Sequence, residues 1–327
     1  MSNIAIIGAG LAGLTAANIL KNNANVTLFE KSRGVGGRIA TRRSEPYFFD
    51  HGAQFFKARS AEFKDFIKPM IEKEIIQPWN ARFVEFENKK ITTKRNWDKD
   101  YQNYVGAPTM NAIGKYLAQD LTINFETKIK SIEKDQDKWQ IIDDKENNLG
   151  SYDWVICAIP PEQASDLIPH STTLFLQINS IKMQGCLSLM LGFEKPLDLD
   201  FDAALIKGED ISWISVNSSK PSRNEAFCLL INSTNKWADE HMDDDRNWVM
   251  NYLCDKTSQI IGCDLSVAQH KSIHGWRYAN IQKQEGEKFL IDESEKIAVC
   301  GDWLIKSRME SAFLSGFKAA NKILEQI

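Results

Sequence analysis

The sequence predicts an α/β fold in which a parallel-sheet domain is interrupted by a strand-rich α+β insertion, and three observations support it. The chain opens with an apolar strand, a glycine-rich turn, a helix and a second strand. This β–α–β rhythm is absent from about residue 58 to 105 and again from about residue 166 to 289. A last apolar strand and an amphipathic helix follow near the C-terminus.

Length and composition are those of an ordinary globular protein that is large enough for two domains. The chain has 327 residues, and single hydrophobic cores stop growing at roughly 250–300 residues. The net charge of −4 argues against a dedicated nucleic-acid binder, because such proteins need a basic surface. The composition leaves the oligomeric state open.

The cysteine and hydropathy patterns bear on metal binding and location. The six cysteines are scattered, without the spacing of a metal site or of a disulfide framework. We therefore expect no metal, and reduced thiols in a cytoplasmic protein. The apolar run from Ile4 to Leu20 contains three glycines and lacks a basic leader, so we expect a strand and a helix there and no membrane span.

The opening segment predicts a turn that binds a dinucleotide. Ile4–Ile7 is a short apolar run, typical of a buried parallel strand. Three glycines follow: Gly8 makes the tight turn, Gly10 lets the backbone approach a pyrophosphate, and Gly13 lets helix and strand pack closely. The start of the helix adds free N–H groups and a positive dipole for the phosphates.

An acid follows at the end of the second strand, Val26–Phe29. Glu30 stands at about the 20-residue spacing at which a carboxylate accepts a hydrogen bond from an adenosine ribose. Strand, glycine turn, helix and acid together predict a Rossmann-like domain. The alternative is that the glycines only tighten a turn and that Glu30 is a solvated strand end.

A second glycine-rich run favours FAD over NAD. After Glu30, the glycines between residues 34 and 37 let the backbone bend closely around a ligand, and Arg38 offers a planar guanidinium to phosphate oxygens. A permanently held dinucleotide benefits from this second phosphate contact, whereas a nicotinamide-binding enzyme has no need of it. The neighbouring arginines are equally compatible with a solvated basic face: Arg33, Arg42 and Arg43.

The next segment is expected to leave the parallel sheet. Its pattern predicts a helix over residues 61–75, short strands around Trp79, Phe83 and Phe86, and a second helix over residues 110–121. We interpret the first part of this segment as an excursion into the inserted domain.

The middle of the chain predicts strands. Extended runs over residues 128–134, 139–143 and 153–159 indicate an antiparallel meander that returns to a buried strand, and the polar residues 144–150 are expected to form a turn. Residues 166–289 are expected to be strand-rich and irregular.

The last segment predicts a strand over residues 297–300 and a helix with apolar residues every three or four positions. The expected apolar face of this helix is Met309, Phe313, Phe317, Ala320 and Leu324. The elements predict two domains: a cofactor domain of residues 1–57, 106–165 and 290–327, and a substrate domain of residues 58–105 and 166–289.

Several segments resemble one family, the renalase-like flavoproteins, especially their bacterial members. The run that ends at Arg38 is similar to the Gly-Gly-Arg segment with which the wider flavin-dependent amine oxidase superfamily helps to hold FAD. The other resembling segments are Phe49–Phe56, Val105–Met110, Trp276–Ala279, Gly301–Trp303 and Ser311–Gly316. The resemblance spans most of the chain and implies a glutathione-reductase-type FAD-binding domain with the amine oxidase/hydroxybenzoate hydroxylase topology.

The resemblance implies non-covalent FAD. It places Asp302 beside the ribityl chain, where its carboxylate would accept a hydrogen bond from a hydroxyl, although Asp302 is also suited to capping the following turn. The helix that starts near Met309 would favour negative charge on reduced flavin. The expected cofactor contacts are Gly8, Gly10, Leu11, Ala12, Gly13, Glu30, Lys31, Gly37, Arg38, His51, Gly52, Ala53, Gln54, Ile129, Gly301, Asp302, Ser311 and Ala312.

The resemblance also implies a reaction. Renalase-like enzymes oxidise 2-dihydro-NAD(P) or 6-dihydro-NAD(P), which are reduced at the wrong ring carbon, to NAD(P)+, and electrons pass through FAD to O2 to give H2O2. The bacterial likeness favours the 2-dihydro isomer. The expected partners are thus a small molecule and O2, with no nucleic acid and no membrane. Hydride transfer needs alignment more than proton-handling residues, so the absence of a competing catalytic motif is expected.

Residues expected to shape the substrate pocket or take part in catalysis are Gln54, His274, Trp276, Arg277 and Tyr278. Aromatic rings there would stack on a flat substrate ring, and Arg277 and Arg308 would meet its phosphates. Trp276 and Tyr278 are equally compatible with ordinary packing, and His51 and His274 with structural hydrogen bonding. Two other functions stay open: an FAD-dependent amine oxidase and a non-catalytic FAD-binding redox sensor.

Overall fold

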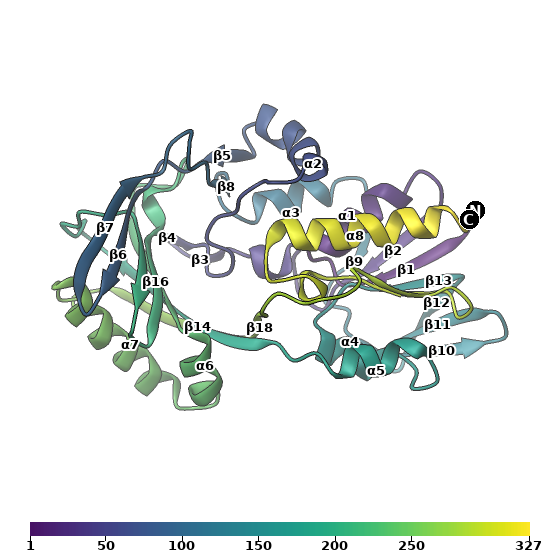
Figure 1. Cartoon of the computed structure of the whole chain (residues 1–327). Coiled ribbons are helices and arrows are strands. Elements are labelled where there is room, and N and C mark those ends of the chain that lie inside the picture. Colours follow the sequence, from purple (N-terminus) through teal and green to yellow (C-terminus); the bar gives the residue numbers. More distant parts are fainter. The chain divides into compact units, whose positions relative to one another are not determined.

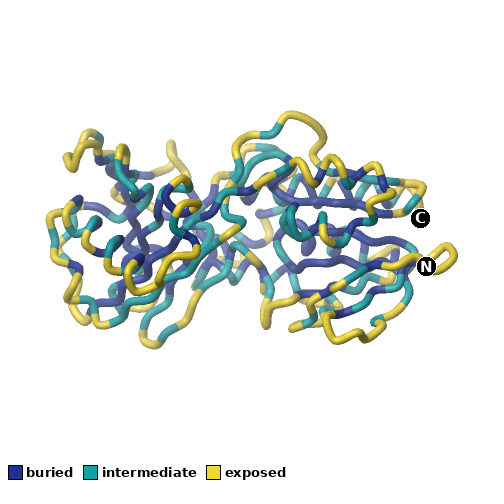
Figure 2. The backbone as a smooth tube through the Cα atoms, turned by 90° about the horizontal axis from the view of Figure 1, so that it is seen from below, coloured by how far each residue is buried: buried dark blue, intermediate teal, exposed yellow.

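The structure, a computed structural model, describes residues 1–327, and the chain folds into two compact units (Figure 1). Unit 1 comprises Met1–Arg38, Gly114–Met183 and Ile281–Ile327, and unit 2 comprises Ile39–Ile113 and Gln184–Asn280. Figure 2 shows buried backbone within both units. Each unit therefore has a core of its own, and the predicted α/β fold class is confirmed.

A six-stranded sheet lies at the centre of unit 1, in the order β19-β20-β13-β1-β2-β9. Its strands are β1 (Asn3–Ile7), β2 (Asn25–Phe29), β9 (Thr122–Asn124), β13 (Trp154–Cys157), β19 (Leu290–Asp292) and β20 (Ile297–Val299). Only the β19–β20 pair is antiparallel. Because both faces of the sheet are covered, β1, β13 and β20 are almost uniformly apolar and buried.

Two helices of unit 1 are in close contact. Figure 1 shows α8 (Met309–Leu324), in yellow, beside α1 (Leu11–Leu20). Gly316 makes this possible, since a Cβ at that position would lie 2.2 Å from the Ala12 carbonyl oxygen. The other elements of the unit are β10 (Ile129–Asp135), β11 (Lys138–Asp143), β12 (Asn148–Tyr152), α4 (Pro161–Leu167), α5 (Thr173–Asn179) and η3 (Asp302–Leu304).

A seven-stranded sheet forms unit 2, in the order β18-β14-β17-β16-β15-β6-β7. Its strands are β6 (Arg82–Glu87), β7 (Lys90–Asn96), β14 (Gln184–Phe193), β15 (Ala203–Lys207), β16 (Ile211–Val216), β17 (Phe227–Ser233) and β18 (His270–Asn280). Apolar side chains of β14 and β17 alternate between two clusters. Leu189 and Ile231 share one cluster with α6 (Asn235–His241) and α7 (Arg246–Ile261), whereas Met190 and Leu230 pack on Phe49 in the other.

Smaller elements complete the fold. Unit 2 adds β3 (Arg42–Ser44), β4 (Tyr47–Phe49), α2 (Ala61–Glu72), β5 (Ile76–Pro78), β8 (Tyr104–Gly106) and η2 (Asn217–Ser219). Two elements extend across the points where the chain changes units: η1 (Gly37–Ile39) and α3 (Ala112–Leu117). None of the helices has the length and apolar character needed to span a bilayer.

The structure differs from several element predictions. The helix expected over residues 110–121 is only the short α3. The third meander strand is β12, where a turn was expected, while the buried strand to which the meander was expected to return is confirmed as β13 in the parallel sheet. Residues 166–289 contain more helix than predicted; α7 was missed because its Trp248 is exposed, so apolar residues lie on both faces and hide the helical period.

The chain changes units after Arg38, Ile113, Met183 and Asn280, rather than after residues 57, 105, 165 and 289. Phe49 explains the first difference, because it packs on Met190 and Leu230 and so ties β4 to the sheet of unit 2. Helices α4 and α5 explain the third, because they pack on β10 and β19 of unit 1.

We expect Gly316→Val to destabilise the protein. The added side chain would collide with the backbone of α1, and such overpacking costs about 1–3 kcal/mol. Chemical denaturation would measure the free energy of unfolding. The matched control is Lys318→Val on the exposed face of the same helix, which should change it by less than about 0.5 kcal/mol. Equal stability of the two variants would contradict the close packing of α1 and α8.

Candidate functional site

The glycine turn between β1 and α1 is shaped by contacts on two sides and by open space on a third. Gly8 has φ +103°, and a Cβ there would lie 2.7 Å from the Ala158 carbonyl oxygen. A Cβ on Gly13 would lie 2.1 Å from the oxygen of Gly8. In contrast, a Cβ on Gly10 would meet nothing within 4 Å, and no side chain caps the start of α1. The first N–H groups of α1 thus stand beside room for a ligand.

The second glycine run lies directly along the first. The Gly36 N–H donates to the Ala9 carbonyl at 2.8 Å, and Gly10 and Gly36 form a parallel bridge. Gly37 has φ +53°, and a Cβ on it would lie 3.6 Å from the Cα of Gly10. The two runs therefore form one backbone cradle, which side chains at these positions would fill.

Glu30 is buried at the edge of this cradle. One carboxylate oxygen accepts the Ala9 N–H at 2.9 Å, and the other accepts the Ser32 N–H at 2.8 Å. Each carboxylate oxygen can accept more than one hydrogen bond, so capacity for a ribose hydroxyl is left. Lys31, the next predicted contact, is exposed and donates to Gln163 at 3.1 Å.

Arg38 and Asp302 were predicted to make separate cofactor contacts, and the structure pairs them with each other. Two parallel hydrogen bonds join them, at 3.0 Å from Nη1 to Oδ2 and at 2.5 Å from Nη2 to Oδ1. The Asp302 side chain is nearly buried, whereas that of Arg38 is 31% exposed. The guanidinium is thus oriented by Asp302 while the Arg38 side chain stays partly exposed, and the alternative role of Asp302 as a side-chain cap receives no support from these contacts.

The start of α8 lies next to the Gly301–Asp302 turn in unit 1. The Gly301 N–H donates to Ser315 Oγ at 2.9 Å, which ties this turn to the helix. Ser311 is buried and Ala312 is half-buried in the first turn of α8, and no side chain caps the helix. Ile129 is buried in β10. Together with the cradle and Glu30, these positions fit a dinucleotide cofactor.

In unit 2 the segment after β4 is anchored by a buried carboxylate. Asp50 accepts hydrogen bonds from Lys220 Nζ at 3.2 Å, Arg223 Nη2 at 2.6 Å, the Met110 N–H at 2.9 Å and Thr41 Oγ1 at 2.7 Å. Burial raises the pKa of Asp50, but the two cations and the Met110 N–H outweigh it and bring the pKa to about 2. Burial lowers the pKa of Lys220 to about 8.

This ion cluster was not predicted. Asp50 lay inside a segment singled out by its resemblance, but nothing in the local sequence marked Lys220 or Arg223, which lie about 170 positions further along the chain. Only spatial proximity pairs them.

Gln54, predicted to be catalytic, is held inside unit 2. Its amide nitrogen donates to the carbonyl oxygens of Asp50 and Gly52, and its oxygen accepts from Ser215 Oγ at 2.9 Å. All polar groups of the side chain are thus engaged within unit 2, where they hold the segment that contains Gly52 and Ala53.

Strand β18 carries four of the predicted pocket residues. His274 and Trp276 share a face, with ring centroids 4.4 Å apart, whereas Arg277 is exposed and forms an ion pair with Asp243. The pairing of β18 with β14 shifts register after Trp276, so the regular alternation of faces does not extend to Tyr278. Arg308, the other predicted phosphate contact, is exposed in unit 1.

The structure adds His51 to this face. Its ring lies 4.8 Å from that of His274 and 5.0 Å from that of Trp276, and the Trp276 indole donates to the His51 carbonyl at 2.8 Å. Burial, with smaller contributions from neighbouring positive charge, lowers the pKa of both histidines to about 4. Both imidazoles are uncharged at neutral pH.

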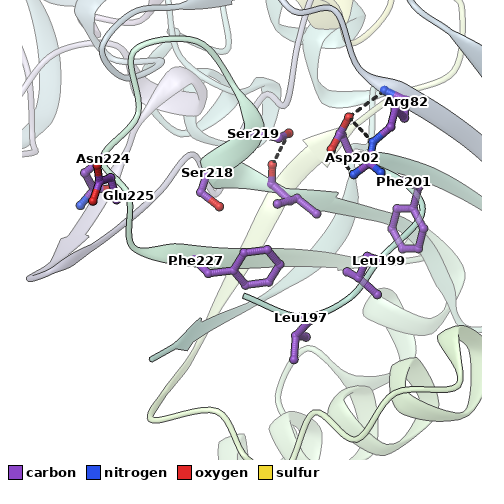
Figure 3. A pocket seen from close by; sticks show the side chains of 11 residues that line it. Arg82, Leu197, Leu199, Phe201, Asp202, Ser218, Ser219, Asn224, Glu225 and Phe227 are labelled. Atoms are coloured by element: carbon purple, nitrogen blue, oxygen red, sulfur yellow. Dashed lines mark hydrogen bonds and ion pairs between the residues drawn. The ribbon is translucent and has the colours of Figure 1, made fainter. Parts of the chain in front are cut away.

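A separate hollow of about 290 Å³ lies elsewhere in unit 2 (Figure 3). Leu197, Leu199 and Phe227 line it together with the ion pair of Arg82 and Asp202. None of the predicted site residues contributes to its wall.

Metal-binding clusters and reactive thiols were also sought among the side chains. No group of three or more His, Cys, Asp or Glu side chains is placed to hold a metal ion. All six cysteines are free, and burial raises the pKa of Cys157 and Cys300 to about 12, so these thiols are inert as nucleophiles.

Comparison with known families and structures gives a consistent result. The model of an NAD(P)-binding Rossmann-like domain matches residues 6–69, and that of flavin containing amine oxidoreductases matches residues 73–324. The chain is similar to renalase of Mus musculus, with 20% identity over 313 residues, or 88% of each protein. It is 31% identical to coproporphyrinogen III oxidase of Staphylococcus aureus over 93 residues, which are 27% of this chain and 20% of that protein.

The chain thus spans about a fifth of the coproporphyrinogen oxidase but most of renalase. Among solved structures, a candidate protoporphyrinogen oxidase of Exiguobacterium sp. 255-15 has a TM-score of 0.80 at 12% identity, covering 100% of this chain and 99% of that one. This likeness supports the fold.

We expect Asp50→Asn to lower the free energy of unfolding by about 3–5 kcal/mol, because two buried cations would lose their only carboxylate. The matched control is Asp243→Asn in the exposed pair with Arg277, where a change below about 1 kcal/mol is expected. Urea denaturation at neutral pH measures both. A neutral result for Asp50→Asn would contradict the assigned role of the ion cluster.

The same carboxylate predicts a pH dependence. The folded-state pKa of Asp50 is lowered from 3.8 to about 2, so its stabilising contribution is complete above about pH 4 and is lost as the pH falls toward 2. The difference in stability between wild type and Asp50→Asn should shrink across this range. A difference that stays constant down to pH 2 would count against the pairing.

Proposed function

This chain belongs to the flavin-containing amine oxidoreductase family, and from this premise we propose that it is an FAD-dependent oxidase of dihydronicotinamide dinucleotides. The proposed substrate is 2-dihydro-NAD(P), or its 6-dihydro isomer, which loses a hydride and becomes NAD(P)+. The two electrons and the proton of the hydride, together with one proton from solvent, reduce O2 to H2O2. The observation that carries this proposal is the likeness to renalase across 88% of the chain, which extends through both units.

The cradle supports FAD as the flavin. Two glycine runs bridged at Gly10 and Gly36 offer N–H groups for a pyrophosphate, and Glu30 stands where an adenosine ribose would be bound. FMN has neither a pyrophosphate nor an adenosine. Arg38, oriented by Asp302, would add a charge-assisted contact, and no covalent link is proposed. When bound, the flavin supplies the two-electron chemistry.

The charges on unit 2 favour a dihydronicotinamide dinucleotide over an amine. None of the residues of β18 that share a face with His274 is acidic, and Arg42 lies beside this face. An alkylammonium substrate would meet a like charge there, whereas an uncharged ring with anionic phosphates would not. The neutral imidazoles and the indole offer an uncharged aromatic environment to such a ring.

Two alternative functions are distinguished from this proposal by the experiments below. An FAD-dependent amine oxidase is favoured by the family description, and a non-catalytic redox sensor would use the same cofactor site. A cytoplasmic location forms part of the proposal, because all six cysteines are free thiols.

Anaerobic mixing with candidate reductants tests the proposed reaction. We expect 2-dihydro-NAD or 6-dihydro-NAD to bleach the flavin absorbance rapidly, and ordinary NADH to do so at least about 100-fold more slowly, because its hydride leaves from a different ring carbon. Readmission of O2 should restore the colour and release H2O2. Faster bleaching by an amine would favour the amine oxidase, and no bleaching by either class would favour the sensor.

Replacing Arg38 tests the cofactor site. We expect Arg38→Ala to lose flavin during gel filtration, with affinity reduced about tenfold or more, because a charge-assisted contact is removed and Asp302 loses its partner. Arg38→Lys should retain an intermediate amount, and Arg33→Ala, an exposed arginine of the same run, should retain all of it. Full flavin occupancy in Arg38→Ala would remove Arg38 from the site.

A further inference from the structure

Arg42 of β3 is surrounded by imidazoles rather than carboxylates. Its Nη2 lies 3.2 Å from Nδ1 of His274. Its charge also contributes to lowering the pKa of His51, His270 and His274, after burial, which is the larger cause. Arg42 forms no ion pair, and the hydrogen bond to His274 is made to an uncharged acceptor. An arginine whose neighbours leave its charge unbalanced is suited to an anionic ligand.

The acids closest to Arg42 in the sequence do not compensate this charge. Glu45, the nearest of them, is exposed and forms no ion pair with Arg42. Asp50 is adjacent to His51 but is fully buried and already paired with Lys220 and Arg223. Asp243, on the other side of β18, is paired with Arg277. The positive charge of Arg42 therefore stays available on the exposed surface of unit 2.

His51 supplies a second, independent observation. The residue is 5% exposed, and its Nδ1 has no hydrogen-bond partner. A buried polar atom without a partner costs free energy, which a ligand atom at that position would recover. The rings of His274 and Trp276 lie against the His51 ring, so the three residues form one cluster.

We propose that Arg42, His274 and His51 form a subsite for a phosphate group on unit 2 and, given the proposed function, that this group belongs to the dihydronicotinamide dinucleotide. Arg42 offers two parallel N–H donors to phosphate oxygens. Because Arg42 donates to Nδ1 of His274, the proton of that imidazole is on Nε2, a further donor. The subsite takes over the role predicted for Arg277, which the structure pairs with Asp243.

Direct binding of inorganic pyrophosphate to the flavin-loaded protein tests the subsite without any turnover. The readout is the NMR titration of the histidine ring protons, assigned by single His→Gln variants. Bound pyrophosphate should offset the charge of Arg42 and raise the pKa of His274 and His51. Absence of any shift at His274 would overturn the proposal.

Two exposed arginines on the same strand provide the matched pair of variants. Arg42→Ala should weaken pyrophosphate binding by about 10–100-fold, as expected for the loss of charge-assisted hydrogen bonds. Arg42→Lys should recover only part of the affinity, because lysine lacks the planar fork. Arg43→Ala should bind as wild type does. Equal loss in the Arg42 and Arg43 variants would reduce the subsite to a diffuse basic surface and overturn it.

Kinetic measurements distinguish a failure of the phosphate subsite from a failure of the proposed function. In anaerobic bleaching, Arg42→Ala should raise the half-saturating concentration of 2-dihydro-NAD by about 10–100-fold and leave that of the 2-dihydronicotinamide riboside, which lacks phosphates, unchanged. If neither compound bleaches the wild type but pyrophosphate still shifts His274, the proposed function fails and the subsite stands for free phosphates. If both compounds bleach wild type and Arg42→Ala alike, the subsite fails and the function stands.

Discussion

The backbone bridge between the two glycine runs is the contact on which the nucleotide-binding part of unit 1 depends. It joins Gly10 to Gly36 and brings the loop after β2 against the start of α1. The bridge also positions Glu30, whose carboxylate accepts N–H groups from both sides of the cradle. Arg38 follows in the same run and donates hydrogen bonds to Asp302, which belongs to the last third of the chain. A side chain at Gly37 would narrow this cradle, which explains why two glycine runs are present.

Two groups of charged residues in unit 2 have different environments. Asp50, Lys220 and Arg223 are buried together, and because a buried charge is costly alone, they are bound to one another and hold the segment that contains His51 and Gln54. Arg42 is exposed and needs no partner for stability, so its charge is free to act on a ligand. The buried ion pairs of Asp50 hold the backbone in place, whereas the unpaired charge of Arg42 can interact with a ligand.

The elements that were predicted well are those whose signals are local. Strands β1 and β2 and helix α8 follow from apolar runs and helical spacing within each segment. Strand β12 was missed because its polar residues become a strand only by pairing with β11. The partners of Gln54 and Arg277 could also not be predicted from the sequence, since Ser215 and Asp243 come from distant parts of the chain.

The sequence by itself determined the glycine turn, the acid after the second strand and the resemblance to a flavoprotein family, because these features depend on residue type. Gly8 and Gly37, for example, have positive φ angles that glycine adopts at little cost. Only the tertiary structure decided which charges are paired. It joins Arg38 to Asp302 and Arg277 to Asp243 and leaves Arg42 beside neutral imidazoles. The strength of an electrostatic interaction depends on the distance between two charges in the folded protein. The order of residues along the chain does not show which distant residues will lie close together.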